Sequence, residues 1–161
     1  MSQYMSLIGQ NARKASLKKI TTKTKNKILK KYASLLDEER NSIIIENTKD
    51  IKFAQKKKLK NNLIDRLTIN HKKLDNMKNS VNKIIKLKDP VDNTLEKWSR
   101  PNGLKIKRVS IPIGVIGVIY ESRPDVTSDV ASLCFKSGNT VILKGGSEAI
   151  NTNKILAKLF R

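Results

Sequence analysis

The stretch Ile113-Gly-Val-Ile-Gly-Val-Ile-Tyr120 is apolar, rich in β-branched residues and too short for a typical helix. Such a run indicates a strand covered on both faces, as in a parallel sheet. Beyond it, Pro124 stands where a helix begins and Gly138 where it ends, and a second apolar run, Thr140-Val-Ile-Leu-Lys144, follows directly. A strand, a helix and a strand within about thirty residues predict a βαβ unit, whose right-handed crossover makes the strands parallel.

Two further elements flank this unit. Residues 94–100 and 104–111 surround Pro101-Asn102-Gly103. A β-hairpin is expected there, because Asn-Gly supplies the positive backbone angles that a tight turn requires. After the second strand, Gly145-Gly146-Ser147 turns the chain into a final helix that runs to Arg161 without a recognisable cap.

The first ninety residues show helical periodicity. Apolar residues recur at three- and four-residue steps and predict four helices, marked by Met5, Ile8, Ala12 and Ala15; by Ile28, Leu29, Tyr32, Leu35 and Leu36; by Ile44, Ile51 and Ala54; and by Leu74, Met77, Val81, Ile84 and Ile85. Asn70 is placed as the N-cap of the fourth helix, and Asp89-Pro90 ends it. The fold class expected is α/β: helices over residues 1–90, a hairpin over 91–111 and the start of a Rossmann-like parallel βαβα sheet over 112–161.

Composition restricts the classes of function. The 161 residues, 38% of them hydrophobic, suffice for one core or for a large part of a bigger domain. No apolar stretch approaches the roughly 20 residues that span a bilayer, and the first residues lack a signal-peptide pattern, so a cytoplasmic protein without membrane contact is expected. With only Cys134 and His71, we expect neither a disulfide framework nor a thiolate metal site.

A formal charge of +20 is the strongest global feature, and it suggests attraction to a polyanion. Residues 1–90 carry a net charge of +15, and residues 91–161 carry +5. Aromatic residues make up only 4% of the chain and offer few stacking platforms for bases. Lysines on solvated helix faces are therefore the favoured interpretation, and a basic helical module that binds nucleic acid through residues 13–60 is the alternative.

Candidate binding residues lie where the two predicted parallel strands end. In an open parallel sheet the ligand crevice forms at the carboxyl ends of the strands, here residues 120–123 and 144–147. Both loops lead into helix N-termini, whose N–H groups favour an anion or a ribose hydroxyl. Lys144 is placed to donate to a ribose and Arg123 to face a phosphate or carboxylate, whereas an ordinary βα turn with solvated side chains is the alternative reading.

Other nucleotide or nucleophile signals are weak. Neither G-x-G-x-x-G nor G-x-x-x-x-G-K-[ST] occurs in the chain. Cys134 falls in register with Val126, Val130 and Leu133, which predicts a place on the buried face of the crossover helix. A buried thiol of this kind is expected to be inert.

A family resemblance is carried by Ile111-Pro-Ile-Gly-Val-Ile-Gly-Val-Ile-Tyr-Glu-Ser-Arg-Pro-Asp-Val126 and by Asp129-Val-Ala-Ser-Leu-Cys-Phe-Lys-Ser-Gly-Asn-Thr-Val-Ile-Leu-Lys-Gly-Gly146. These runs resemble the γ-glutamyl phosphate reductases, also called glutamate-5-semialdehyde dehydrogenases, of the aldehyde dehydrogenase superfamily. Weaker similarity at Asp65-Arg66-Leu67 and Asp89-Pro90-Val91 extends the resemblance over nearly the whole chain.

The resemblance implies an NADPH-dependent reduction of L-glutamyl 5-phosphate to L-glutamate 5-semialdehyde and phosphate, in proline biosynthesis. It also implies a cysteine nucleophile. That cysteine and the catalytic domain are expected beyond residue 161, so residues 1–161 would be the N-terminal part of the NADP-binding domain, unable to turn over substrate alone. A homo-oligomer, with the 91–111 hairpin in its bridging or oligomerisation element, and an association with glutamate 5-kinase are expected, and no nucleic acid.

The resemblance also assigns residues within the two loops. The NADP(H) crevice would be lined by Ile119, Tyr120, Glu121, Lys144 and Ser147, the last two at the adenosine ribose. Ser122 and Arg123 stand where many superfamily members have an oxyanion-donating Asn, and they are candidate substrate or oxyanion contacts. Glu148 lies one residue later than the ribose-binding acid of typical aldehyde dehydrogenases, so that role is not transferred to it.

Overall fold

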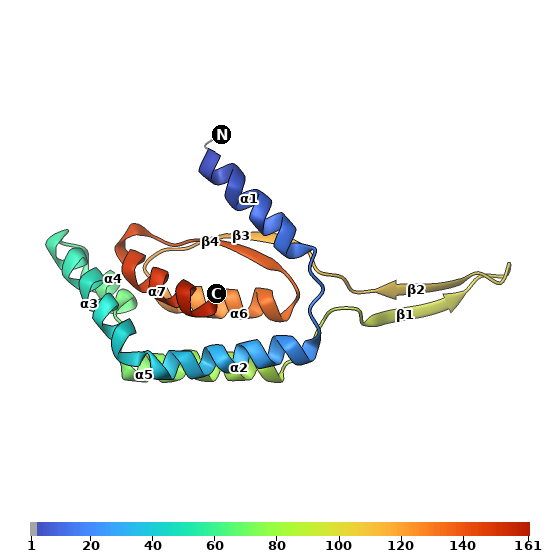
Figure 1. Cartoon of the computed structure of the whole chain (residues 1–161), viewed down its shortest axis with the longest axis horizontal. Helices are drawn as coiled ribbons and strands as arrows, with labels where there is room; N and C mark the ends of the chain where they lie inside the picture. Colours follow the sequence, from blue (N-terminus) through green and yellow to red (C-terminus); the bar gives the residue numbers. More distant parts are fainter. Residues whose placement is uncertain (1–2) are drawn as a thin grey trace.

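The computed structural model describes residues 3–161, in which helices cover both faces of a two-stranded parallel sheet (Figure 1). In chain order the elements are α1 (Gln3–Ser16), α2 (Thr22–Glu38), α3 (Arg40–Lys56), α4 (Asn61–Leu67), α5 (His71–Lys86), β1 (Thr94–Ser99), β2 (Lys105–Val109), β3 (Val115–Ile119), α6 (Pro124–Lys136), β4 (Thr140–Lys144), the 3-10 turn η1 (Ser147–Ala149) and α7 (Ile150–Phe160). Among residues 3–161, no helix has the length and apolar character needed to cross a bilayer.

The four predicted N-terminal helices form as α1, α2, α3 and α5. The side chain of Asn70 caps α5 as expected, accepting a hydrogen bond of 2.9 Å from the backbone N–H of Lys73. Thr21 caps α2 in the same way through the N–H of Thr24. The short helix α4 was not predicted, because its seven residues bury only Leu67 and leave no apolar periodicity to read.

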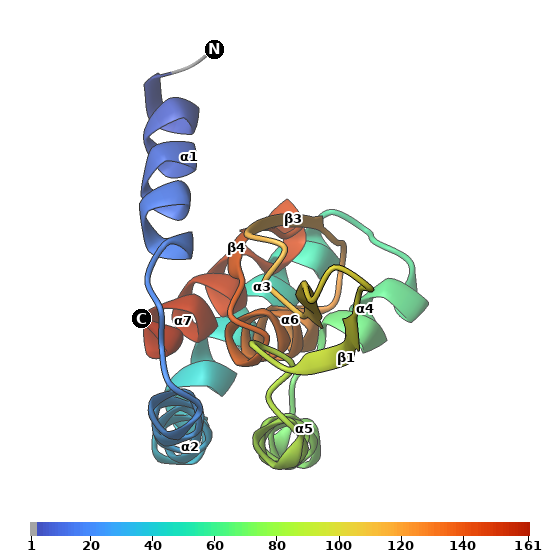
Figure 2. The ribbon, with the colours of Figure 1, turned by 90° about the vertical axis from the view of Figure 1, so that its right-hand side faces the viewer.

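The βαβ unit is confirmed. Strands β3 and β4 pair in parallel, from Val115 opposite Thr140 to Ile119 opposite Lys144, and α6 is the crossover between them. Helix α1 lies on one face of this pair and α6 on the other, with α2 and α5 packed beyond α6 (Figures 1 and 2). The main core lies among α2, α5 and the helices that contact them, and it includes Leu29, Leu74 and Leu156.

The predicted hairpin is confirmed as the antiparallel pair β1–β2. Its turn closes through a hydrogen bond of 2.9 Å from the Gly103 N–H to the Arg100 carbonyl, and Gly103 has a φ of +83°. The hairpin projects away from the helices (Figure 1), and every residue of β1 is exposed. Because the chain passes from β2 directly into β3, the hairpin lies at the opposite end of the sheet from the carboxyl ends of β3 and β4.

Two burial predictions were wrong. Strand β3 is not covered on both faces: Ile119 at its end is 78% exposed, and Ile113 just before it is 83% exposed. Among the described residues only β4 pairs with it, so one side of the strand has no neighbour. Helix α6 buries the small residues Thr127, Ser128, Ala131, Ser132 and Cys134, whereas Leu133 is 46% exposed. Small side chains suit this face because α6 packs on α5, α7 and β4 at once.

Buried polar residues on α3 hold the start of α7. The carboxylate of Asp50 accepts hydrogen bonds from the N–H groups of Asn151 (3.1 Å) and Thr152 (2.8 Å) and from the Thr152 hydroxyl (2.7 Å). These are N–H groups at the first turn of α7, so the cap of this helix comes from a residue about a hundred positions earlier. Asn47, also on α3, holds the end of α4 instead: it donates to the Leu67 carbonyl and accepts from the Ile69 N–H.

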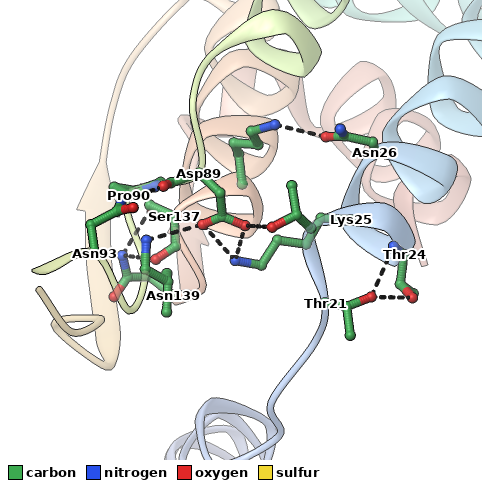
Figure 3. Close-up of polar contacts among 12 residues, drawn as sticks. Thr21, Thr24, Lys25, Asn26, Asp89, Pro90, Asn93, Ser137 and Asn139 are labelled. Atoms are coloured by element: carbon green, nitrogen blue, oxygen red, sulfur yellow. Dashed lines mark hydrogen bonds and ion pairs between the residues drawn. The ribbon is translucent and has the colours of Figure 1, made fainter.

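A buried ion pair fixes the junction between the helices and the hairpin (Figure 3). Nζ of Lys25 lies 2.9 Å from Oδ2 of Asp89, and the two side chains are only 3% and 12% exposed. The Asp89 carboxylate also accepts from the Thr22 hydroxyl at 2.8 Å and from the Val91 N–H at 3.0 Å. Burial acts to raise the pKa of Asp89, but these donors and the Lys25 charge outweigh it and hold the pKa below its ordinary value.

Removing the carboxylate should therefore destabilise the chain. Asp89→Ala leaves the Lys25 ammonium buried without its partner, and we expect a loss of about 3 kcal/mol in the free energy of unfolding, measured by urea denaturation. The control is Glu38→Ala, which breaks the exposed Lys31–Glu38 pair and should cost less than about 1 kcal/mol.

The same ion pair gives a pH dependence with a defined sign. Since the folded-state pKa of Asp89 is depressed, its stabilisation is complete above the unfolded-state pKa and is lost as the pH falls through the folded-state value. The wild-type chain should thus lose more stability than Asp89→Asn when the pH is lowered below about 4. If the free energies of unfolding of the two chains fall equally as the pH is lowered, this assignment is contradicted.

Candidate nucleotide-binding crevice

The two predicted loops lie side by side at the carboxyl edge of the sheet. The backbone N–H of Tyr120 donates to the Lys144 carbonyl at 3.1 Å, which extends the parallel pairing one residue past the end of β3. The loop from β3 then enters α6 at Pro124, the first helical residue, and the loop from β4 enters η1 at Ser147. The residues expected to share one crevice are thus brought together.

Glu148 ties the loops to each other. Its Oε1 accepts hydrogen bonds from the backbone N–H of Ser122 at 2.6 Å and from the Ser122 hydroxyl at 3.0 Å. Ser122 is buried and has a φ of +44°, a left-handed conformation that serine rarely adopts. The double contact from Glu148 compensates the strain of this conformation and fixes the β3–α6 loop.

The charge of Glu148 suits this role. Burial acts to raise the pKa of its carboxyl, but the hydrogen bonds from its own N–H and from Ser122, together with the Lys144 charge, hold the pKa below its ordinary value. Glu148 is therefore a carboxylate at neutral pH. No local pattern in the sequence predicts this contact, because the partners are 26 residues apart and Glu148 resembles an exposed residue of a helix start.

Three of the expected cofactor residues expose their side chains at this edge: Lys144, Ser147 and Glu121. The side chain of Lys144 makes no hydrogen bond or ion pair with any other residue in the range 3–161, so its ammonium is available to a ligand. The exposed side chain of Ile119 adds an apolar surface beside them. This combination provides hydrogen-bond donors and an apolar wall, as a nucleotide requires.

Tyr120 differs from these residues, because its side chain points into the protein. Its hydroxyl lies 2.5 Å from Oγ1 of Thr127 on α6, and that threonine contacts Oδ1 of Asn153 on α7 at 2.9 Å. Burial raises the pKa of the Tyr120 phenol, which stays neutral. Tyr120 thus joins the loop to both helices beneath it.

Side chains of the protein pack closely against the two glycines of the β4 loop. A Cβ at Gly145 would collide with the amide of Asn153, and one at Gly146 with the carboxylate of Glu148. Both glycines therefore permit the close approach of side chains that brace the crevice from within.

Arg123 is exposed just before α6, where its guanidinium lies 3.1 Å from Oδ2 of Asp125. Cys134 is buried, as predicted, and burial raises the pKa of its thiol, so it is a poor nucleophile. In the basic segment 13–60, Lys25 is already committed to a buried ion pair.

The fold is that of the aldehyde dehydrogenases. A putative aldehyde dehydrogenase from Bacillus subtilis superposes with a TM-score of 0.64 at 21% identity, over 92% of this chain and 31% of that one. At this level of identity the likeness shows the fold alone. No protein-family model matches the sequence.

Much greater similarity connects the chain to one group within that fold. The crystal structure of γ-glutamyl phosphate reductase from Thermotoga maritima has a TM-score of 0.90 and 44% identity, covering 94% of this chain and 37% of that one. The Saccharomyces cerevisiae enzyme of the same name has a TM-score of 0.92 and 35% identity, covering 99% and 41%. The curated γ-glutamyl phosphate reductase of Persephonella marina is 43% identical over 160 residues.

The chain is thus a homologue of the γ-glutamyl phosphate reductases, which confirms the resemblance drawn from its sequence. It spans little more than a third of the length of these relatives: 36% of the Persephonella marina protein and 37% of that from Halothermothrix orenii.

The contact between the two loops can be tested directly. Glu148→Ala removes the acceptor of the Ser122 N–H and hydroxyl, so we expect hydrogen exchange of the Ser122 amide to accelerate about tenfold or more. Mass spectrometry of a peptide that contains residue 122 would measure the change. The control is Glu121→Ala, which removes an exposed carboxylate from the same loop; equal exchange in both variants would contradict the role of Glu148.

Proposed function

We propose that residues 1–161 form the dinucleotide-binding part of a protein that reduces L-glutamyl 5-phosphate to L-glutamate 5-semialdehyde and phosphate, on the route to proline. NADPH is the proposed hydride donor. The observation that carries the proposal is the pair of braced loops at the carboxyl edge of β3 and β4, with Lys144 unpaired among the described residues, in a homologue of the γ-glutamyl phosphate reductases. The activity is assigned to a whole protein with the length of these relatives.

The exposed residues of the crevice fit a dinucleotide. Lys144 and Ser147 would hold the adenosine ribose, because an ammonium and a hydroxyl can both bond its hydroxyl groups. Ile119 would cover an apolar ring face, and Glu121 would lie at the same edge. When bound, the cofactor would supply the hydride, and the contribution of these residues is its position and orientation.

Arg123 is our first candidate for the contact with the anionic acyl phosphate. Both hydrogen-bond donors of Ser122 are committed to Glu148, whereas the Arg123 guanidinium is exposed just before α6 and has further N–H groups beyond its bond to Asp125. A guanidinium can bind phosphate in a bidentate manner. We propose that Ser122 acts mainly by shaping the loop that presents Arg123.

The hairpin is the proposed bridging element of a homo-oligomer. It projects from the helices and exposes Leu95, Trp98 and Val109 along strands β1 and β2. Apolar side chains on a projecting hairpin favour burial against a second copy of the protein. Its position at the far end of the sheet would keep such an interface away from the crevice.

Substitution of Lys144 tests the cofactor site. Isothermal titration of NADPH into the chain should give a Kd about tenfold or more weaker for Lys144→Ala than for the wild type, the usual effect of a lost charge-assisted hydrogen bond. Lys154→Ala is the matched control, because it removes the same charge from the exposed side of α7.

Equal affinity of all three chains for NADPH would refute the role of Lys144. A weakening of similar size in Lys144→Ala and Lys154→Ala would instead attribute binding to the general positive charge of the chain. Titration with NADH under the same conditions tests the preference for the phosphorylated cofactor.

A further inference from the structure

A cavity of about 750 Å³ lies beside the candidate crevice, between α4, α5 and the first half of α6. Its wall includes Arg123 and Pro124, the residues that lead from the β3–α6 loop into α6. The volume is in the usual range for small-molecule sites. A molecule whose reactive end meets the β3–α6 loop would therefore have room for its other end in this cavity.

Three of the six charged side chains in the wall, those of Lys73, Arg123 and Asp125, already have partners within the protein. Nζ of Lys73 donates to the carbonyls of Asp65 (2.7 Å) and Thr68 (2.5 Å), so this lysine is part of the structure of the wall. Arg123 is paired with Asp125 at 3.1 Å. The guanidinium of Arg66, by contrast, is exposed and makes no hydrogen bond or ion pair with another residue between 3 and 161.

Asp129 is the acidic residue in the wall that has a buried oxygen without a partner within residues 3–161. Its Oδ1 is shielded from solvent and has no hydrogen-bond partner among the described residues, an unusual state for a buried carboxylate oxygen. Burial raises the pKa of this carboxyl, and the nearby Asp125 adds to the effect, while Ser80 and Arg123 oppose it without cancelling it. The charge of Arg123 thus does not compensate the burial of Asp129.

We propose that Asp129 binds the α-ammonium group of an amino-acid substrate in this cavity, with Arg66 at its α-carboxylate. An ammonium ion in the cavity would supply the charge that Asp129 lacks, and a rotation of the Asp129 carboxylate would bring the shielded Oδ1 to this donor. A guanidinium can bind the substrate carboxylate in a bidentate manner. The inference rests on the proposed function and deepens it, because it names the groups that would distinguish a glutamyl substrate from other acyl phosphates.

The spacing along α6 agrees with this orientation. With a rise of about 1.5 Å per residue, Asp129 lies about 6 Å further along the helix than Asp125, which is bonded to Arg123. In an extended glutamyl chain, four bonds of ordinary length separate the α-nitrogen from the acyl carbon, a distance of about 5 Å. One molecule can thus reach from the loop to Asp129.

The test compares two stable ligands that differ at the group in question. L-glutamate has the ammonium group, and glutarate has the same carbon chain without it; in both, the 5-carboxylate takes the place of the acyl phosphate. In NMR titrations of the full 161-residue chain, we expect L-glutamate to bind about tenfold or more tighter than glutarate. Asp129→Asn, which is nearly isosteric, should abolish this preference and leave glutarate binding undiminished.

Asp125→Asn is the matched control, because it removes a charge from the same wall and should keep the preference for L-glutamate. Arg66→Gln should weaken the binding of both L-glutamate and glutarate. Unchanged circular dichroism spectra would establish that each variant folds. The proposal is overturned if wild-type protein binds neither ligand or binds both equally. It is also overturned if Asp129→Asn and Asp125→Asn lose the preference to the same extent.

The two proposed sites can fail separately. NADPH binding that depends on Lys144, combined with equal binding of L-glutamate and glutarate, would contradict the Asp129 site alone. A preference for L-glutamate that depends on Asp129, without NADPH binding, would contradict the cofactor assignment and leave the amino-acid site in place.

Discussion

The parallel pairing of β3 with β4 is the constraint on which the rest of the structure depends. Parallel strands need a crossover, and α6 provides it, so both strands must end at the same edge. Two loops and two helix N-termini therefore lie at that edge, and this follows from the topology alone, independently of the side chains in the loops. The chemistry of the crevice comes from the residues that the sequence places there, above all Lys144 and Arg123.

Side-chain hydrogen bonds between distant segments then give this arrangement its precision. Glu148 fixes Ser122 across the crevice, and Asp50 fixes the start of α7 from α3. At the other end of the sheet, Lys25 and Asp89 join α2 to the segment that leads into the hairpin. Each contact places a charged or polar group where burial excludes water, so each depends strongly on having its partner.

The sequence predicted those features that local patterns determine. The Asn70 cap, the Asn-Gly turn before Leu104 and the Pro124 helix start all depend on neighbours within a few residues, and all are found in the structure. Side by side placement of the loops also followed, because it depends only on the parallel topology. Helix α4 was missed, since seven residues with one buried side chain carry almost no periodic signal.

What the sequence could not predict depends on tertiary partners. The cap of α7 comes from Asp50 and the acceptor for Ser122 from Glu148, and no local pattern marks either pairing. The buried face of α6 was predicted from its large apolar residues, whereas close packing on α2, α5, α7 and β4 selects the small ones. The unpaired oxygen of Asp129 likewise becomes visible only when the wall around it is assembled.

The projecting hairpin is joined to the helices only at its base, so a small movement at the base becomes a large displacement at the tip. Its strands of five and six residues make an arm of about 20 Å, and a small rotation at Asp89 would be multiplied along that length. The contacts of Asp89 with Lys25, Thr22 and Val91 therefore help to set the direction of the arm. The buried Lys25–Asp89 pair would thus influence the alignment of any surface that binds the tip of the β1–β2 hairpin.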